Sequence, residues 1–217
     1  MDLRPDRAGI AQAAREIFTD GPLLLRKMQH LRPAICPFDE LLPIVPPGAT
    51  VLDIGCGSGL FLGLLHHFGY GVRGFGFDAS RTAIDCANAM ARQHGKGQLH
   101  FKHVREQEPW PEGRFDVVSL IDVLHHIPVV HQESAFQAAA DRVAPGGLLL
   151  YKDISDSPWY LSSANRMHDL LVAREWINYV PVKLTERWAA HLQLELHRSA
   201  TFRMLWYKHD LRVYRKA

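Results

Sequence analysis

The sequence predicts an α/β fold built around a mostly parallel β-sheet. Short apolar runs at residues 50–54, 72–77 and 115–121 are each followed by a turn and then by a segment in which apolar side chains recur at helical spacing. The run at 115–121 is almost continuously apolar, as expected of a strand buried on both faces of a parallel sheet. The 217 residues suffice for one such domain with an added cap.

The residues ahead of the first strand are predicted to be helical. Apolar side chains recur at helical spacing over 8–18 and again over 23–31, and Gly21-Pro22 separates the two segments. A short apolar helix is expected over 38–44, after which the turn Pro47-Gly48 leads into the strand at 50–54.

A glycine-rich turn follows that strand, in the stretch VLDIGCGSG at residues 51–59. Its glycines let the backbone approach a ligand closely, and a helix beginning near Ser58 directs free N–H groups at the bound molecule. A dinucleotide fingerprint would need glycine at position 60, where this chain has Leu60. The spacing therefore favours another cofactor, with contacts expected from Asp53, Gly55, Cys56 and Gly57.

An acidic residue, Asp78, ends the second strand about twenty residues after the glycine turn. A carboxylate at this position can accept hydrogen bonds from both hydroxyls of an adenosine ribose. Ser80 is expected to cap the helix that follows. Ala79 and Ser80 are therefore candidate cofactor contacts together with Asp78.

The third, fourth and fifth strands are expected over residues 99–104, 115–121 and 148–153. The fourth ends in the stretch DVLHHIP at 122–128, and the turn APGG at 144–147 precedes the fifth. Ligands of open parallel sheets bind at the carboxyl ends of the strands, so Ile121 and Asp122 are expected to contact the cofactor.

These motifs resemble those of a known family. VLDIGCGSG resembles the first motif of class I S-adenosylmethionine (SAM)-dependent methyltransferases, and FDVV with VLHHIP and APGG resembles later motifs of the methyltransferase type 11 group, which includes menaquinone and ubiquinone biosynthesis enzymes. The resemblance covers roughly residues 45–155. It implies SAM as the methyl donor, S-adenosylhomocysteine (SAH) as the product and a small-molecule methyl acceptor.

The resemblance also implies a Rossmann-like, seven-stranded, mostly parallel sheet with helices on both faces, N-terminal helices and a helical lid inserted after strand five. We expect one domain over residues 1–217. Its parts are an N-terminal helical cap at 1–47, a cofactor-binding core at 48–156, a lid insertion at 157–181, and a C-terminal helix with the last two strands at 182–217.

The adenine contact departs from the family pattern. The family usually has an aspartate just after strand three, and Val104 stands there in this chain. Arg105, Glu106 or a backbone group is expected to hold adenine instead. Arg32 is a candidate for the cofactor's carboxylate, although an exposed surface charge is the more common role of such an arginine.

Methyl transfer is an in-line displacement, and a hydroxyl acceptor benefits from a base that titrates near neutral pH. His125 and His126 are adjacent and point about 100° apart on a helical turn, so only one of them is expected to face the cofactor. Either can instead be an ordinary loop histidine. Asp153, at the end of strand five, and His168, in the lid, are further catalytic candidates.

Asp122 and Asp153 end neighbouring strands, which raises a metal-assisted mechanism, but no third oxygen ligand is evident and no metal is expected. The favoured activity is methylation of an oxygen or nitrogen of a small metabolite. A SAM-binding sensor without turnover and a nicotinamide oxidoreductase are the alternatives. Nucleic-acid amino methylation normally shows an N/D-P-P-Y/F box after strand four, which IDVLHHIP lacks.

The remaining features concern composition and the C-terminal segment. The net charge is +2 and three dispersed cysteines suggest neither disulfides nor zinc, so we expect a cytoplasmic protein without a membrane span. A helix is expected over 182–191. The basic side chains after residue 197 are expected on the wet face of an edge strand, and residues 207–210 in a bulge or loop. Oligomeric state is left open.

Overall fold

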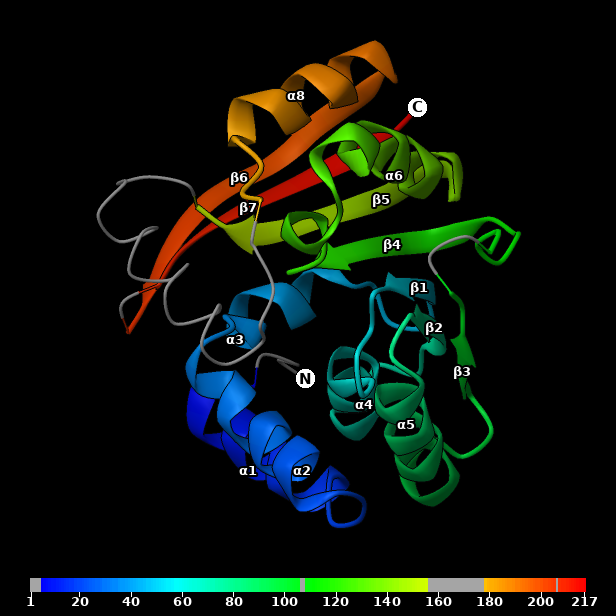
Figure 1. Ribbon diagram of the computed structural model, residues 1–217, viewed down its shortest axis with the longest axis vertical. Coiled ribbons are helices and arrows are strands. Elements are labelled where there is room, and N and C mark those ends of the chain that lie inside the picture. Colours follow the sequence, from blue (N-terminus) through cyan, green and yellow to red (C-terminus); the bar gives the residue numbers. More distant parts are fainter. Residues whose placement is uncertain (1–4, 106–107, 156–177, 206) are drawn as a thin grey trace. The chain divides into compact units, whose positions relative to one another are not determined.

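The computed structural model describes residues 5–105, 108–155, 178–205 and 207–217. These residues form two compact units, Met1–Gly113 and Arg114–Ala217, each of which is described by itself. Their seven strands and the helices between them are drawn in Figure 1.

The first unit contains three parallel strands in the order β3-β2-β1, in which Asp53 pairs with Gly76 and Asp78 with His103. Two helices lie against these strands and against each other (Figure 1). The elements are β1 (Thr50–Ile54), α4 (Leu60–His67), β2 (Arg73–Asp78), α5 (Arg81–His94) and β3 (Leu99–His103).

The predicted N-terminal helices are present as α1 (Arg7–Ile17) and α2 (Leu23–Leu31), and short turns follow them. Gly21, at a φ of 100°, separates the two helices as expected. The helix α1 buries Ile10, Ala13, Ala14 and Ile17 and contacts α4. The turns that follow are η1 (Arg32–Ala34), α3 (Phe38–Leu41) and η2 (Leu42–Ile44).

The second unit contains four strands in the order β4-β5-β7-β6, and only β7 runs antiparallel to its neighbours. An aromatic cluster of Phe136, Tyr151, Trp188 and Tyr214 joins its helices to its strands. The elements are β4 (Phe115–Ile121), η3 (Leu124–His126), α6 (Val129–Asp141), β5 (Val143–Ile154), α8 (Val182–His191), β6 (Leu194–Met204) and β7 (Tyr207–Lys216).

The predicted class, a Rossmann-like, mostly parallel, seven-stranded α/β fold, is therefore confirmed. Two boundaries differ from the expectation. The helix after the glycine turn begins at Leu60 rather than near Ser58, because Gly59 is left-handed at a φ of 81°. The strand β5 begins at Val143 and includes the APGG stretch, where its register with β4 shifts between Phe115 and Val117.

The expectation of a bulge or loop at 207–210 was wrong. Tyr207–Lys216 is one continuous strand that pairs with both β5 and β6, and it is buried along most of its length. A strand that is buried on both faces does not alternate between apolar and polar residues. The break in alternation near Trp206 therefore did not indicate a bulge. The basic side chains are correspondingly divided: Arg198 lies on the edge strand β6, whereas Arg212 lies in β7 and binds Glu186.

The expected lid falls largely outside the described residues. Of the segment 157–181, the structure describes only 178–181, which have no regular secondary structure and in which Tyr179 and Val180 are buried. Within the part of the chain that is described, no helix is both long enough and apolar enough to cross a membrane.

Candidate active site

The glycine turn in the first unit has the backbone conformation that its glycines allow. Gly55, Gly57 and Gly59 all have positive φ, at 64°, 53° and 81°. A Cβ atom on Gly59 would lie 2.6 Å from the Phe101 ring, so a side chain cannot be accommodated without a shift. The turn therefore brings bare backbone to the end of β1, as a cofactor loop requires.

Asp78 holds this turn in place from the end of β2. Its Oδ2 accepts a hydrogen bond of 2.8 Å from the Gly57 amide, and its Oδ1 accepts one of 2.8 Å from the Ser80 amide. Ser80 caps α5 as predicted, because its hydroxyl accepts from the Ala83 amide. The carboxylate is thus oriented by two backbone donors, one on each of its oxygens.

Asp53 and Cys56 line the start of the turn. Asp53 is buried at the end of β1, two residues before Gly55. Burial, together with the nearby carboxylates of Asp53 and Asp78, raises the pKa of the Cys56 thiol well above its ordinary value. Cys56 therefore stays a neutral thiol, which suits it to packing against a ligand and not to nucleophilic chemistry.

His103 is a residue of this region that the sequence reasoning missed. Its Nε2 donates to the Ala79 carbonyl over 3.0 Å, and the neighbouring Val104 amide donates to the Asp78 carbonyl. The end of β3 thereby fixes the backbone of residues 78–80. No motif signals this contact, because it depends on the register of β2 and β3.

The other predicted cofactor contacts of the first unit are Arg32, Arg105 and Glu106. Arg32 begins the turn η1 and is half-buried. Arg105 is exposed, and its amide donates to the Glu108 carboxylate over 3.2 Å. Glu106 lies outside the described residues. Trp110 packs against Phe77, with ring centroids 5.2 Å apart.

In the second unit, Ile121 ends β4 and Asp122 follows in a left-handed conformation, at a φ of 57°. This conformation is uncommon for a residue with a side chain. The Asp122 amide donates to the Lys152 carbonyl on β5, and the fully buried Lys152 ammonium donates back to Asp122 Oδ1 over 2.6 Å. This double link holds the Asp122 carboxylate at the end of the strand.

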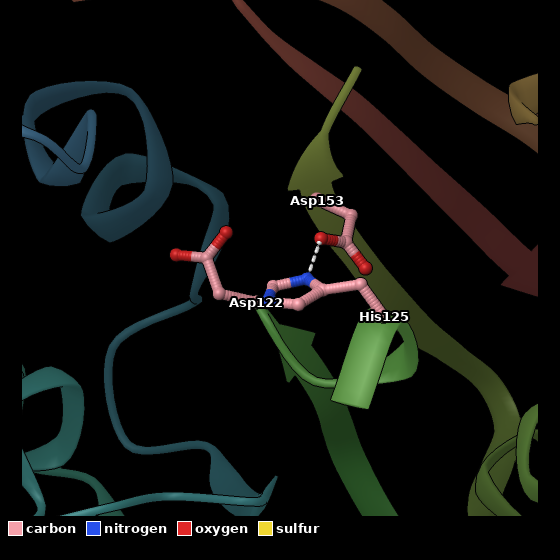
Figure 2. A group of neighbouring side chains, drawn as sticks. All are labelled: Asp122, His125 and Asp153. Atoms are coloured by element: carbon pink, nitrogen blue, oxygen red, sulfur yellow. Dashed lines mark hydrogen bonds and ion pairs between the residues drawn. The ribbon is translucent and has the colours of Figure 1, made fainter. Parts of the chain in front are cut away.

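His125 lies in the turn η3 with only 3% of its surface exposed. Its Nδ1 donates to Asp153 Oδ1 at the end of β5, and Figure 2 shows the imidazole between the carboxylates of Asp153 and Asp122. Asp153 Oδ1 also accepts from the Ile154 amide over 2.8 Å. Asp153 Oδ2 is buried and has no hydrogen-bond partner among the described residues.

Backbone contacts fix the loop that carries His125. The His125 carbonyl accepts from the Asn178 amide over 3.0 Å. The side-chain amide of Gln132, in α6, reaches the carbonyl oxygens of Leu124, Ile127 and Asn178. Gln132 is buried and was not a sequence candidate, since a lone glutamine in a helix carries no recognisable signal.

The charges around His125 determine its titration. Burial by itself lowers the pKa of His125, but the Asp153 carboxylate, through its charge and its hydrogen bond, and the Asp122 carboxylate together outweigh burial and raise this pKa above its ordinary value. A histidine in this environment therefore accepts a proton more readily than a free imidazole does.

His126 and His168 differ from His125 in what the structure shows. His126 is exposed and its ring lies next to that of His125, with centroids 4.1 Å apart. His168 lies outside the described residues. Of the predicted catalytic residues, the fold therefore brings together His125 and Asp153 in one hydrogen-bonded pair, with His126 beside it.

The side chains of Asp122, His125 and Asp153 have the spacing of a metal site. One ligand atom each from Asp122, His125 and Asp153 lies within 4.8 Å of the others. The Lys152 ammonium already contacts Asp122, and His125 Nδ1 already binds Asp153, so two of the acceptor groups are engaged by protein cations or donors. A cation here would have to displace these contacts.

The glycine turn, the aspartate at the end of β2, and the strand pattern with one antiparallel strand define the class I SAM-dependent methyltransferase fold. The sequence pattern of the family described as a methyltransferase domain matches residues 25–199, and the chain belongs to this family. The resemblance inferred from the motifs is thereby confirmed, and SAM is the methyl donor of the class.

Related proteins and structures agree with this assignment. The chain is 32% identical over 109 residues to a ubiquinone biosynthesis O-methyltransferase of Shewanella pealeana, covering 50% of this chain and 44% of that protein. It is 27% identical over 157 residues to the protein of the same name from Alkalilimnicola ehrlichii, covering 69% of this chain and 62% of that protein. The chain thus spans less than two thirds of the length of either relative.

Two solved structures share the fold. Magnesium protoporphyrin IX methyltransferase of Synechocystis PCC 6803 with bound SAH aligns with a TM-score of 0.71 at 17% identity, covering 95% of this chain and 94% of that one. An O-methyltransferase family protein from Burkholderia thailandensis aligns with a TM-score of 0.66 at 19% identity, covering 97% and 59%.

Proposed function

We propose that this chain transfers the methyl group of SAM to an oxygen atom of a small-molecule acceptor by in-line displacement. The buried His125–Asp153 pair at the end of β5 is the observation that carries the proposal. A hydroxyl is a weak nucleophile until it loses its proton, and a histidine oriented by a carboxylate is suited to accept that proton. The names of the relatives, which are O-methyltransferases, support oxygen over nitrogen.

Cofactor binding is assigned to the first unit. Asp78 has the position to accept from the ribose hydroxyls, and the Gly55–Gly57 backbone has the conformation to lie against the methionine part of SAM. Asp53, Cys56, Ala79 and Ser80 complete the group on β1, β2 and the turn. Ile121, Asp122, Arg32, Arg105 and Glu106 stay candidates for further contacts.

Acceptor activation is assigned to His125. Its Nδ1–H is committed to Asp153, so the free electron pair of the neutral ring is on Nε2. As the acceptor oxygen attacks the methyl carbon, the C–O bond forms, the C–S bond breaks with its electrons staying on sulfur, and the acceptor proton passes to Nε2. Asp153 stabilises the imidazolium that results.

The experiment combines binding with turnover. Calorimetric titration with SAM and SAH measures cofactor affinity, and SAH release against a panel of phenols, catechols and amines measures methylation. We expect His125→Ala to lower the methylation rate about 10²–10⁴-fold and to retain its affinity for SAM. His126→Ala is the matched control, because it removes the same ring from an exposed position next door.

Three outcomes would contradict the proposal. Full activity in His125→Ala with loss in His126→Ala would move the base to the exposed histidine. Tight SAM binding without SAH release from any acceptor class would favour a sensor, and binding of a nicotinamide dinucleotide in place of SAM would favour an oxidoreductase.

A further inference from the structure

The helix α2 has an unusual distribution of side chains. Four large apolar residues of α2 are half or more exposed: Leu23 at 57%, Leu24 at 72%, Met28 at 50% and Leu31 at 66%. The buried residue of this helix is the polar Gln29. A helix on a water-soluble surface ordinarily has the opposite arrangement. We call these four residues the α2 apolar face.

The α2 apolar face is one continuous stripe. At about 100° per residue, its four members and Lys27 fall within an arc of about 140° on the same side of the helix. Scattered surface leucines are ordinary, whereas a contiguous apolar stripe marks an interaction surface.

Polar contacts beside the apolar face hold α2 against the chain. The Arg26 guanidinium donates to the Thr19 carbonyl over 2.7 Å, and His30 Nε2 donates to the Phe18 carbonyl over 2.9 Å. Turning the leucines inward would break both hydrogen bonds. The outward direction of the apolar stripe therefore follows from the way the helix is anchored.

The charge around the α2 apolar face is positive. No acidic residue occurs between Asp20 and Asp39, and this stretch contains Arg26, Lys27 and Arg32. Lys27 is exposed within the stripe, and Arg26 and Arg32, both half-buried, lie at its two edges. An apolar stripe with a basic rim is complementary to an anionic lipid surface, where apolar side chains enter the acyl boundary and cations meet the headgroups.

We propose that α2 binds an anionic membrane surface through its apolar face, with the helix lying in the plane of the interface. The nine-residue helix is too short to cross a bilayer, so the contact is peripheral. A second copy of the chain fits this surface less well, because a two-fold contact centred on the stripe would bring Lys27 against its own counterpart. The proposal does not depend on the proposed methyl transfer.

The test is co-sedimentation of the full chain with vesicles made of equal parts phosphatidylcholine and phosphatidylglycerol, compared with vesicles of phosphatidylcholine alone. We expect binding to the anionic vesicles that is about tenfold or more weaker in the double variant Leu24→Gln/Leu31→Gln. Lys27→Glu should weaken binding and reduce its dependence on salt.

The control is the double variant Leu196→Gln/Leu205→Gln, which removes two comparably exposed leucines of the other unit, at 52% in the edge strand β6 and at 64% directly after it. It should bind vesicles like the unaltered protein. Thermal unfolding of every variant establishes that each is folded. Equal loss in both double variants, or no binding to either vesicle, would overturn the proposal. A dimer in sedimentation velocity that Leu24→Gln/Leu31→Gln dissociates, without vesicle binding, would assign the face to a second copy instead.

Discussion

His125 and Asp153 form an acid–base pair whose charge depends on pH. The raised pKa of His125 means that the neutral, proton-accepting ring becomes abundant only as the pH rises above about 6.5. We therefore predict that kcat increases with pH and has its midpoint above that value. In Asp153→Asn the favourable carboxylate is lost and burial dominates, so the midpoint should move to lower pH while the maximal rate falls. A pH profile of both proteins measures this, and an unmoved midpoint would separate Asp153 from the titrating group.

Lys152 bears on whether the site uses a metal. Its ammonium is fully buried and binds Asp122 Oδ1, which is one of the three groups with metal-site spacing. Because a protein cation already neutralises this carboxylate, we predict that chelation by EDTA and addition of Mg²⁺ each leave the methylation rate unchanged. Rates measured after dialysis against chelator, with and without added Mg²⁺, test this. A rate that is lost on chelation and restored by Mg²⁺ would contradict this prediction.

At the scale of single elements, the start of α4 depends on Gly59. In Gly59→Ala the new Cβ meets the Phe101 ring at 2.6 Å, in addition to the strain of a positive φ. Gly69→Ala is the matched control, since Gly69 has a φ of 76° and nothing within 4 Å of its added Cβ. Each substitution should lower the free energy of unfolding by about 1 kcal/mol, because alanine is strained at a positive φ. Only Gly59→Ala should lower it further and weaken SAM binding. Urea unfolding and calorimetry would show the difference, and equal losses would contradict it.

The elements differ in how well the sequence predicts them. The strand β1, the cap Ser80 and the break at Gly21 follow from local chemistry, and each lies where it was expected. The nature of β7 was mispredicted at Tyr207–Asp210 because its burial comes from pairing with β5 and β6, which a local pattern does not contain. The sequence therefore predicts an element correctly when neighbouring residues along the chain determine it, and fails where pairing with distant strands does.

The same distinction applies to the candidate site. Asp78 and the glycine turn are recognisable because their spacing is set along the chain. The pairing of His125 with Asp153, 28 residues apart, depends on η3 folding back on β5, so the sequence named both residues without predicting their contact. The contacts of His103 and Gln132 are also tertiary, and neither residue belongs to a motif.

For the molecule as a whole, cofactor binding should appear as stability. A ligand that binds only the folded chain, present at about 100 times its dissociation constant, stabilises it by about 2.7 kcal/mol. We predict that SAM and SAH raise the thermal midpoint of the protein and that Asp78→Asn loses most of this increase. Differential scanning calorimetry with and without ligand measures it. An equal increase in the variant would remove Asp78 from the cofactor site.

The contacts of Gln132 have an evolutionary consequence. Among the residues that the structure describes, its side-chain Nε2 binds the backbone carbonyls of Leu124, Ile127 and Asn178. Every residue type offers the same carbonyl, so these three positions are free to diverge in related chains while the donor at 132 is under constraint. A glutamate at position 132 would put an acceptor where the amide donor stands, and its carboxylate would repel the three carbonyl oxygens. Among descendants of a common ancestor we therefore expect an amide donor at 132 beside variable partners, without pairwise covariation to reveal the contact.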